Sequence, residues 1–153
     1  MKYAFESLPT LSVDDARTLL AKHSFTHDDL DSPEMASGFL GSLRPYRGSL
    51  NRNAFIEVMA CLKSIGPELS TETLVHRKTI SNLWGICHLS RDWATHPNGM
   101  LRRNNLISDA DIKTIEHWID CISYATMMFL DCQDPTAAFA QYEDYVADQK
   151  DAG

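Results

Sequence analysis

Apolar residues recur at helical spacing along most of the chain, and no stretch keeps the two-residue alternation of a half-buried strand. Phe55, Val58, Met59 and Leu62, for example, fall on one face of a helix. Stripes of this kind predict helices and no strands. The expected ranges are about 13–22, 33–43, 51–65, 70–94, 109–131 and 135–149.

Local signals support the boundaries of these helices. Ser108 is a typical helix cap, and it comes directly before the stripe of 109–131. Gly66-Pro67 predicts the end of the helix at 51–65, because this pair is typical of a C-terminal stop. His96-Pro97 ends the helix at 70–94, since a residue before proline avoids helical geometry.

The chain is therefore expected to be all-α, forming one domain over residues 1–153 as a bundle of about six helices. A length of 153 residues is common for a single domain and sufficient for a core. The helices at 70–94 and 109–131 are the longest and are expected at the centre of the bundle. Residues 147–153 are expected to form a frayed tail.

Composition favours a cytoplasmic protein. The longest apolar run is far shorter than the ~20 residues that span a bilayer, so no membrane association is expected. Acidic residues interrupt the N-terminal segment before the apolar region of a secretion signal could form. The four cysteines form no C-x-x-C pair and have apolar neighbours, which predicts reduced and mostly buried thiols.

The net charge of −7 is unevenly distributed along the chain. Residues 42–107 carry nine basic and four acidic side chains, whereas residues 108–153 carry two basic and ten acidic ones. One interpretation, which we favour, is that these segments fold against each other and neutralise. The alternative is a basic patch that meets an anionic partner.

The helix predicted at 70–94 has an unusual outer face. A tryptophan stands there among basic and hydrogen-bonding side chains, with a glycine beside it, and such a face could bind an anionic or aromatic ligand or a partner protein. The candidate binding residues on this face are Arg77, Ser81, Trp84, Gly85, His88 and Arg91. The structural interpretation, which we favour, is that the helix at 33–43 covers the tryptophan and the arginines pair with the acidic C-terminal segment.

Gly85 is a further unusual residue on this face. A glycine in a helix interior costs about 1 kcal/mol relative to alanine. We therefore expect close packing or close approach of another group to offset that cost.

The corner between the two longest predicted helices also carries charge. Asn98-Gly99 supplies a turn, and Arg102 and Arg103 follow it. We expect these arginines to form salt bridges with Asp109 and Asp111 or with the last helix. Alternatively, they form the rim of a site on the Trp84 face.

The helix at 109–131 carries a second stripe opposite its isoleucines, made of His117, Cys121, Tyr124 and Met128. A helix that is apolar on two sides is either central in its domain or lies between the domain and a partner. Central is the commoner case. The alternative makes this stripe the interface of a homodimer.

Motifs for catalysis and cofactor binding are absent from the sequence. His88 and Asp92, and likewise His117 and Cys121, have the i,i+4 spacing of metal ligands, but neither pair belongs to an H-E-x-x-H motif. The chain has no G-x-S-x-G elbow and no phosphate-binding glycine loop. We expect no metal and no cofactor. Nucleic acid is an unlikely partner at a pI near 5.2 without a helix-turn-helix signature.

These observations predict a non-enzymatic cytoplasmic protein that acts through protein–protein interaction and associates with itself. The alternative is a binder of a small anionic or aromatic ligand on the face of Arg77, Trp84, His88 and Arg91. A metal-dependent enzyme and a nucleic-acid binder are more distant alternatives.

Overall fold

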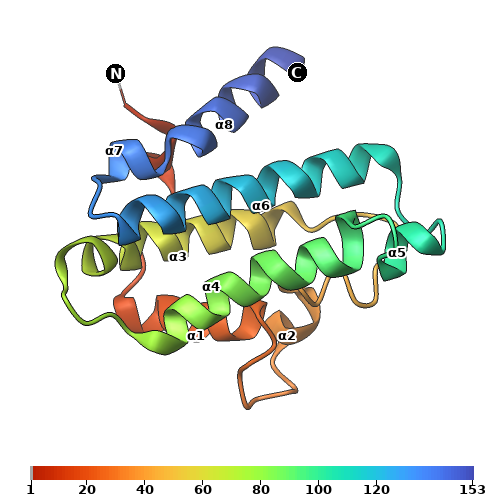
Figure 1. Cartoon of the computed structure of the whole chain (residues 1–153), viewed down its shortest axis with the longest axis horizontal. Helices are drawn as coiled ribbons and strands as arrows, with labels where there is room; N and C mark the ends of the chain where they lie inside the picture. The colour runs from red at the N-terminus through yellow and green to blue at the C-terminus, as the bar shows by residue number, and fades with distance from the viewer. Residues whose placement is uncertain (1) are drawn as a thin grey trace.

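The computed structural model describes residues 2–153, and this part of the chain folds into helices joined by short connections (Figure 1). The all-α class and the bundle of about six helices are confirmed. The elements are η1 (Ala4–Ser7), α1 (Val13–His23), α2 (Pro33–Ser37), α3 (Arg52–Thr71), α4 (Arg77–Ser90), η2 (Arg91–Thr95), α5 (Met100–Arg103), α6 (Asp109–Leu130), α7 (Pro135–Ala138) and α8 (Ala140–Ala152).

Four helices form the body of the bundle. Around the ring, α1 packs on α3, α3 on α6, α6 on α4 and α4 on α1. The short α7 and the C-terminal α8 lie on the opposite side of α6 from α4, and η1 packs against α8 (Figure 1). Thus α6 has neighbours on several sides and is central, as expected. The helix predicted at 70–94 is not the second longest, because α4 has 14 residues and α3 has 20.

The contact between α3 and α6 provides much of the core. Phe55 of α3 stacks on Trp118 of α6 with ring centroids 5.0 Å apart. The indole N–H of Trp118 donates a hydrogen bond to the hydroxyl of Tyr145 in α8, at 2.9 Å. Both partners of this bond are buried, so the indole N–H is satisfied inside the core.

The prediction that Gly66-Pro67 ends a helix is wrong, because α3 continues to Thr71. Gly66 is buried, and a Cβ at this position would overlap the ring of Phe129 in α6. The glycine therefore serves close packing between two helices instead of a C-terminal stop. Pro67 is tolerated inside the helix, and Leu69, which is buried, anchors the last turn to the core.

The helix predicted at 70–94 begins later than expected, at Arg77. The helical spacing places His76 on the same face as Leu83 and Cys87, which predicts a core position. His76 is instead exposed and caps the helix, since its Nδ1 accepts the backbone N–H of Thr79 at 3.2 Å. At the other end, α4 passes into the π-helical turn η2, and the N–H of His96 donates to the carbonyl of Arg91 at 2.8 Å. The predicted end before Pro97 is confirmed.

The remaining helices differ from the predicted ranges mainly at their ends. The helix predicted at 109–131 is present as α6, with Ser108 capping it through the N–H of Asp111 at 3.1 Å. The helix predicted at 33–43 is shorter and ends at Ser37. The last predicted helix is divided into α7 and α8 at the buried Phe139, and α8 extends to Ala152.

Within residues 2–153, no helix combines the length and the apolar character that crossing a bilayer requires.

The two glycines at 66 and 85 should respond oppositely to alanine. We expect Gly66→Ala to lower the free energy of unfolding by about 1–3 kcal/mol, because the added methyl overlaps the Phe129 ring. Gly85→Ala should raise it by up to about 1 kcal/mol, because a Cβ at Gly85 meets no atom within 4 Å and alanine favours the helix. Urea denaturation of both variants measures the difference. Equal effects would contradict the packing role of Gly66.

Candidate binding cleft between α4 and α6

The outer face of α4 is open to solvent. Trp84 is 74% exposed, and Arg77, Ser81, His88 and Arg91 are exposed on either side of it. Helix α2 does not cover Trp84, so the favoured expectation that the helix at 33–43 lies over this ring is wrong. Instead, Arg44 stacks on the ring of Trp93 in η2, with its guanidinium carbon 5.3 Å from the ring centroid.

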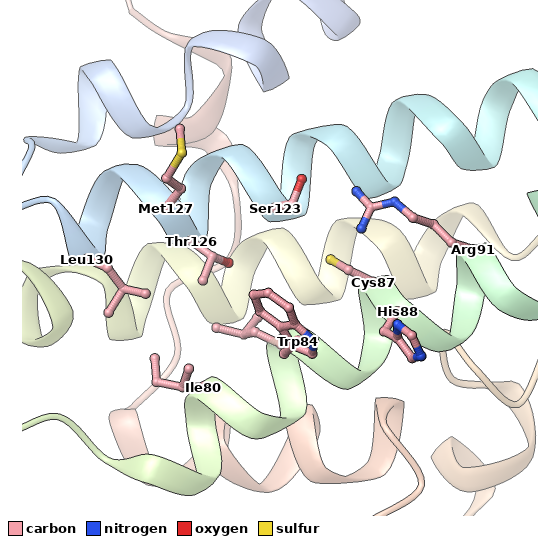
Figure 2. A pocket seen from close by; sticks show the side chains of 10 residues that line it. Ile80, Trp84, Cys87, His88, Arg91, Ser123, Thr126, Met127 and Leu130 are labelled. Carbon is pink, nitrogen blue, oxygen red and sulfur yellow. The ribbon is translucent and has the colours of Figure 1, made fainter.

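A cleft of about 310 Å³ runs between this face and α6. Figure 2 shows side chains of both helices around it, and they are mostly apolar, with Arg91, His88 and the thiol of Cys87 as the charged or titratable groups. Met127 of α6 is 54% exposed at its rim. The lining residues are Ile80, Leu83, Trp84, Cys87, His88, Arg91, Ser123, Thr126, Met127 and Leu130.

The two helices run antiparallel along the cleft. Arg91, near the end of the α4 segment, shares a smaller hollow with Glu116 and Asp120 of α6. At the other end, Ile80 lies across from Leu130. The cleft therefore extends over about three turns of α4, or about 16 Å.

The structure brings together most of the predicted binding residues and adds an α6 half that the sequence did not identify. Trp84, His88 and Arg91 line the cleft itself, and Arg77, Ser81 and Gly85 continue the same surface on α4. The α6 side chains that complete it were not among the candidates. Their positions lie at the edge of the isoleucine stripe, and sequence periodicity does not show which helix will lie beside them.

Gly85 has no close neighbour within the described chain, since a Cβ there would meet no atom within 4 Å. The expectation of close packing at this glycine inside the monomer is wrong. Only a separate molecule could still approach Gly85 closely.

Arg102 and Arg103 form no salt bridge within residues 2–153, so the expected pairing with Asp109 and Asp111 is wrong. Arg102 instead donates to the backbone carbonyl of Thr95 at 2.8 Å and fixes the end of η2. Asp111 accepts a hydrogen bond from the hydroxyl of Tyr46, while Arg103 is exposed. Neither arginine lines the cleft.

The second stripe of α6, for which a homodimer interface was the alternative, is not a continuous exposed surface. Cys121 is buried and Tyr124 and Met128 are partly buried, while His117 is exposed with its ring 6.1 Å from that of Tyr145 in α8. Because α8 packs along this side of α6, the chain itself covers part of the stripe.

The two candidate metal-ligand pairs do not combine into one site. In the part of the chain that the structure describes, no three His, Cys, Asp or Glu side chains converge as metal ligands would.

Sequence reasoning missed a contact between a buried histidine and a partly exposed carboxylate. His23 of α1 is 2% exposed, and its Nδ1 accepts the backbone N–H of Phe39 at 2.9 Å. The proton of the neutral ring therefore lies on Nε2, which is 2.7 Å from the carboxylate of Glu57 in α3. Both ring nitrogens are occupied, so this pair fastens α1 and the segment after α2 to α3. Sequence separation conceals it, because the partners lie 34 residues apart.

The buried thiols are held in their protonated form. Burial raises the pKa of Cys87, in the wall of the cleft, to about 12, against a smaller lowering by Arg91. Burial likewise raises the pKa of Cys121 to about 12 and raises the pKa of Cys61. Cys132 is exposed. Since the thiolate is the nucleophile, Cys87 is unsuited to nucleophilic chemistry near neutral pH.

The chain matches no family model, and neither a curated protein nor a solved structure shows significant similarity to it. The geometry of the cleft is therefore the basis for a functional inference.

Thiol labelling tests the burial of the cleft wall. Near neutral pH, we expect a disulfide reagent such as DTNB to react rapidly with Cys132 only, because the other three thiols are buried and protonated. Cys132→Ser should remove the fast reaction, and denaturant should expose the remaining thiols. A second fast thiol in the native protein that Cys87→Ser removes would show that the wall around Cys87 opens.

Proposed function

We propose that this protein is a non-enzymatic binding module of the cytoplasm that receives apolar side chains of another polypeptide in the α4–α6 cleft. The observation that carries the proposal is the position of Trp84, which is 74% exposed at the rim of an apolar cleft. Tryptophan and arginine are enriched among the residues that dominate the energy of protein interfaces. In this cleft, Trp84 and Arg91 lie on the same surface.

The shape of the cleft suits a polypeptide. It is bordered by two antiparallel helices over about three turns, and a helix that lies in such a groove presents anchors at positions i, i+3 or i+4, and i+7. Trp84 and Met127 stand on opposite edges, so both lose exposed apolar surface when an apolar segment lies between them. Arg91 and His88 at one end supply donors that orient the partner.

Two observations support the absence of catalytic chemistry and the location in the cytoplasm. The thiol in the wall of the cleft has a pKa raised to about 12 by burial and is not an activated nucleophile. The four cysteines are free and three are buried, and unpaired thiols are typical of proteins from reducing compartments.

A small amphiphilic anion is the second candidate occupant. A volume of about 310 Å³ is at the lower end of the range for small-molecule sites. Arg91 forms no ion pair within residues 2–153, so its guanidinium is available to an anionic group while apolar walls hold the remainder.

Photo-cross-linking from position 127 tests the main proposal. We expect a benzoylphenylalanine residue in place of Met127 to form, on irradiation in cells, a covalent adduct of defined mass with a polypeptide, because position 127 lies at the rim of the cleft. Trp84→Ala should abolish the adduct. Electrophoresis and mass spectrometry of the adduct provide the measurement.

Two controls accompany the cross-linking experiment. The same photoreactive residue at Leu74, which is 89% exposed and outside the cleft, should not form this adduct. Trp84→Ala should change the free energy of unfolding by only about 0.5 kcal/mol, because the side chain is largely exposed. No adduct from position 127, or the same adduct from position 74, would refute the proposal.

An aromatic sulfonate tests the second candidate. If the cleft takes small anions, 1-anilinonaphthalene-8-sulfonate should bind at a single site, and Trp84→Ala and Arg91→Ala should each weaken binding about tenfold or more. Arg47→Ala, which alters an exposed arginine outside the cleft, serves as the control. Titration followed by dye fluorescence measures affinity and stoichiometry. Equal binding by all variants would exclude this site.

A further inference from the structure

Opposite charges border the two edges of the α4–α6 cleft. On the α4 edge, Arg77 and Arg91 are exposed near the two ends, with Trp84 between them. On the α6 edge, Asp120 lies at the same end as Arg91, and Asp131 follows Leu130 at the other end. Within residues 2–153 none of these four charged side chains forms an ion pair. Each edge therefore keeps its charge available to a partner.

The charges of this face pair with those of a second copy when one particular two-fold axis relates the two copies. A two-fold axis that lies in the plane of the face and runs along the cleft exchanges the two edges and preserves the direction along them. The α4 edge of one copy then faces the α6 edge of the other, with Arg91 opposite Asp120 and Arg77 opposite Asp131. A two-fold axis across the cleft would instead bring α4 against α4 and place arginine opposite arginine, which is unfavourable.

From this charge complementarity we infer that the occupant of the cleft is the same face of a second copy of the chain, related by the two-fold axis along the cleft. The inference rests on the proposed binding function and names its partner. Such an interface is isologous, because every contact between the two copies occurs twice. It forms a bundle from α4 and α6 of each copy.

The apolar side chains agree with this arrangement. Trp84 lies near the middle of the α4 edge, and Ser123 and Met127 lie near the middle of the α6 edge (Figure 2). In the dimer, Trp84 of each copy covers Ser123 and Met127 of the other. The most exposed aromatic ring of the face and its exposed methionine thereby leave water together.

The size of the face predicts the strength of the dimer. Helix α4 is about 20 Å long, and two packed helices present a face about 20 Å wide. The resulting plan area, about 400 Å² per copy, is below the ~800 Å² of accessible surface that each partner of a standard stable complex buries. The dimer is therefore weak, in exchange with monomer, and its formation depends on protein concentration and salt.

Sedimentation velocity on the purified full chain at several concentrations tests the inference. We expect the wild-type protein to dimerise reversibly. Arg91→Glu and Asp120→Arg should each raise the dimer dissociation constant about tenfold or more, because two attractive contacts per dimer become repulsive.

An equimolar mixture of the two variants should recover dimerisation. The carboxylate introduced in one variant then meets the guanidinium introduced in the other, and the native pair of Arg91 and Asp120 forms at the second contact. Arg47→Glu and Asp148→Arg make the same charge changes at exposed positions outside the cleft and should dimerise like the wild type.

The equimolar mixture of the two variants distinguishes a contact between two copies from a contact within one chain. If the two variants are monomeric and their mixture stays monomeric, the charges act within the chain and the two-fold arrangement is refuted. A wild-type dimer that neither variant weakens refutes it as well. A wild-type protein that is monomeric at every concentration refutes the second-copy partner. The binding function would still stand in that case if position 127 cross-links to a different polypeptide in cells, and it fails only if that adduct is missing.

Discussion

The close packing of α3 on α6 is the constraint on which the rest of the structure depends. Gly66 lets the ring of Phe129 lie directly against α3, and Phe55 stacks on Trp118 farther along the same interface. This contact fixes the rotation of α6, so its isoleucines face inward. One flank of α6 then receives α8, and the other receives α4. Between α4 and α6 no further element of the described chain covers the surface around Trp84, and there the cleft remains open.

Much of the fold could be predicted from periodicity and caps, and the errors share one physical cause. Ser108 and the isoleucine stripe located α6 nearly to the residue. Gly66 and His76 were misassigned because each residue type has two uses in helical proteins. A glycine ends helices but also permits close helix packing, and a histidine on an apolar spacing can fill a core or cap a helix. Only the tertiary neighbour, here the ring of Phe129 or the N–H of Thr79, decides between the uses.

The candidate site was predictable to about half its extent for a similar reason. Tryptophan among arginines on one helical face is a local pattern, so the α4 edge could be found from the sequence. The α6 edge has no such pattern, because Ser123, Met127 and Leu130 lie between the isoleucine stripe and the second stripe of the helix. Their role arises when α4 packs alongside. The contact between His23 and Glu57 could not be predicted from the sequence either, because it forms only when α1 packs against α3.

The distribution of charge has a different meaning in three dimensions than along the chain. Neutralisation of the basic middle by the acidic C-terminal segment was expected within one molecule, yet the ion pairs of residues 2–153 lie among α1, α2 and α3. The arginines of the α4 edge, Arg77 and Arg91, and the aspartates of the α6 edge, Asp120 and Asp131, are instead kept on opposite sides of a cleft that the chain leaves uncovered. Within one molecule, charges held apart in this way attract each other weakly through water. In the proposed dimer, the two-fold axis along the cleft places the arginines of one copy directly opposite the aspartates of the other. A face with positive charges on one helix and negative charges on its neighbour is therefore complementary to a second copy of itself. Charges of both signs mixed along each helix would not produce this complementarity.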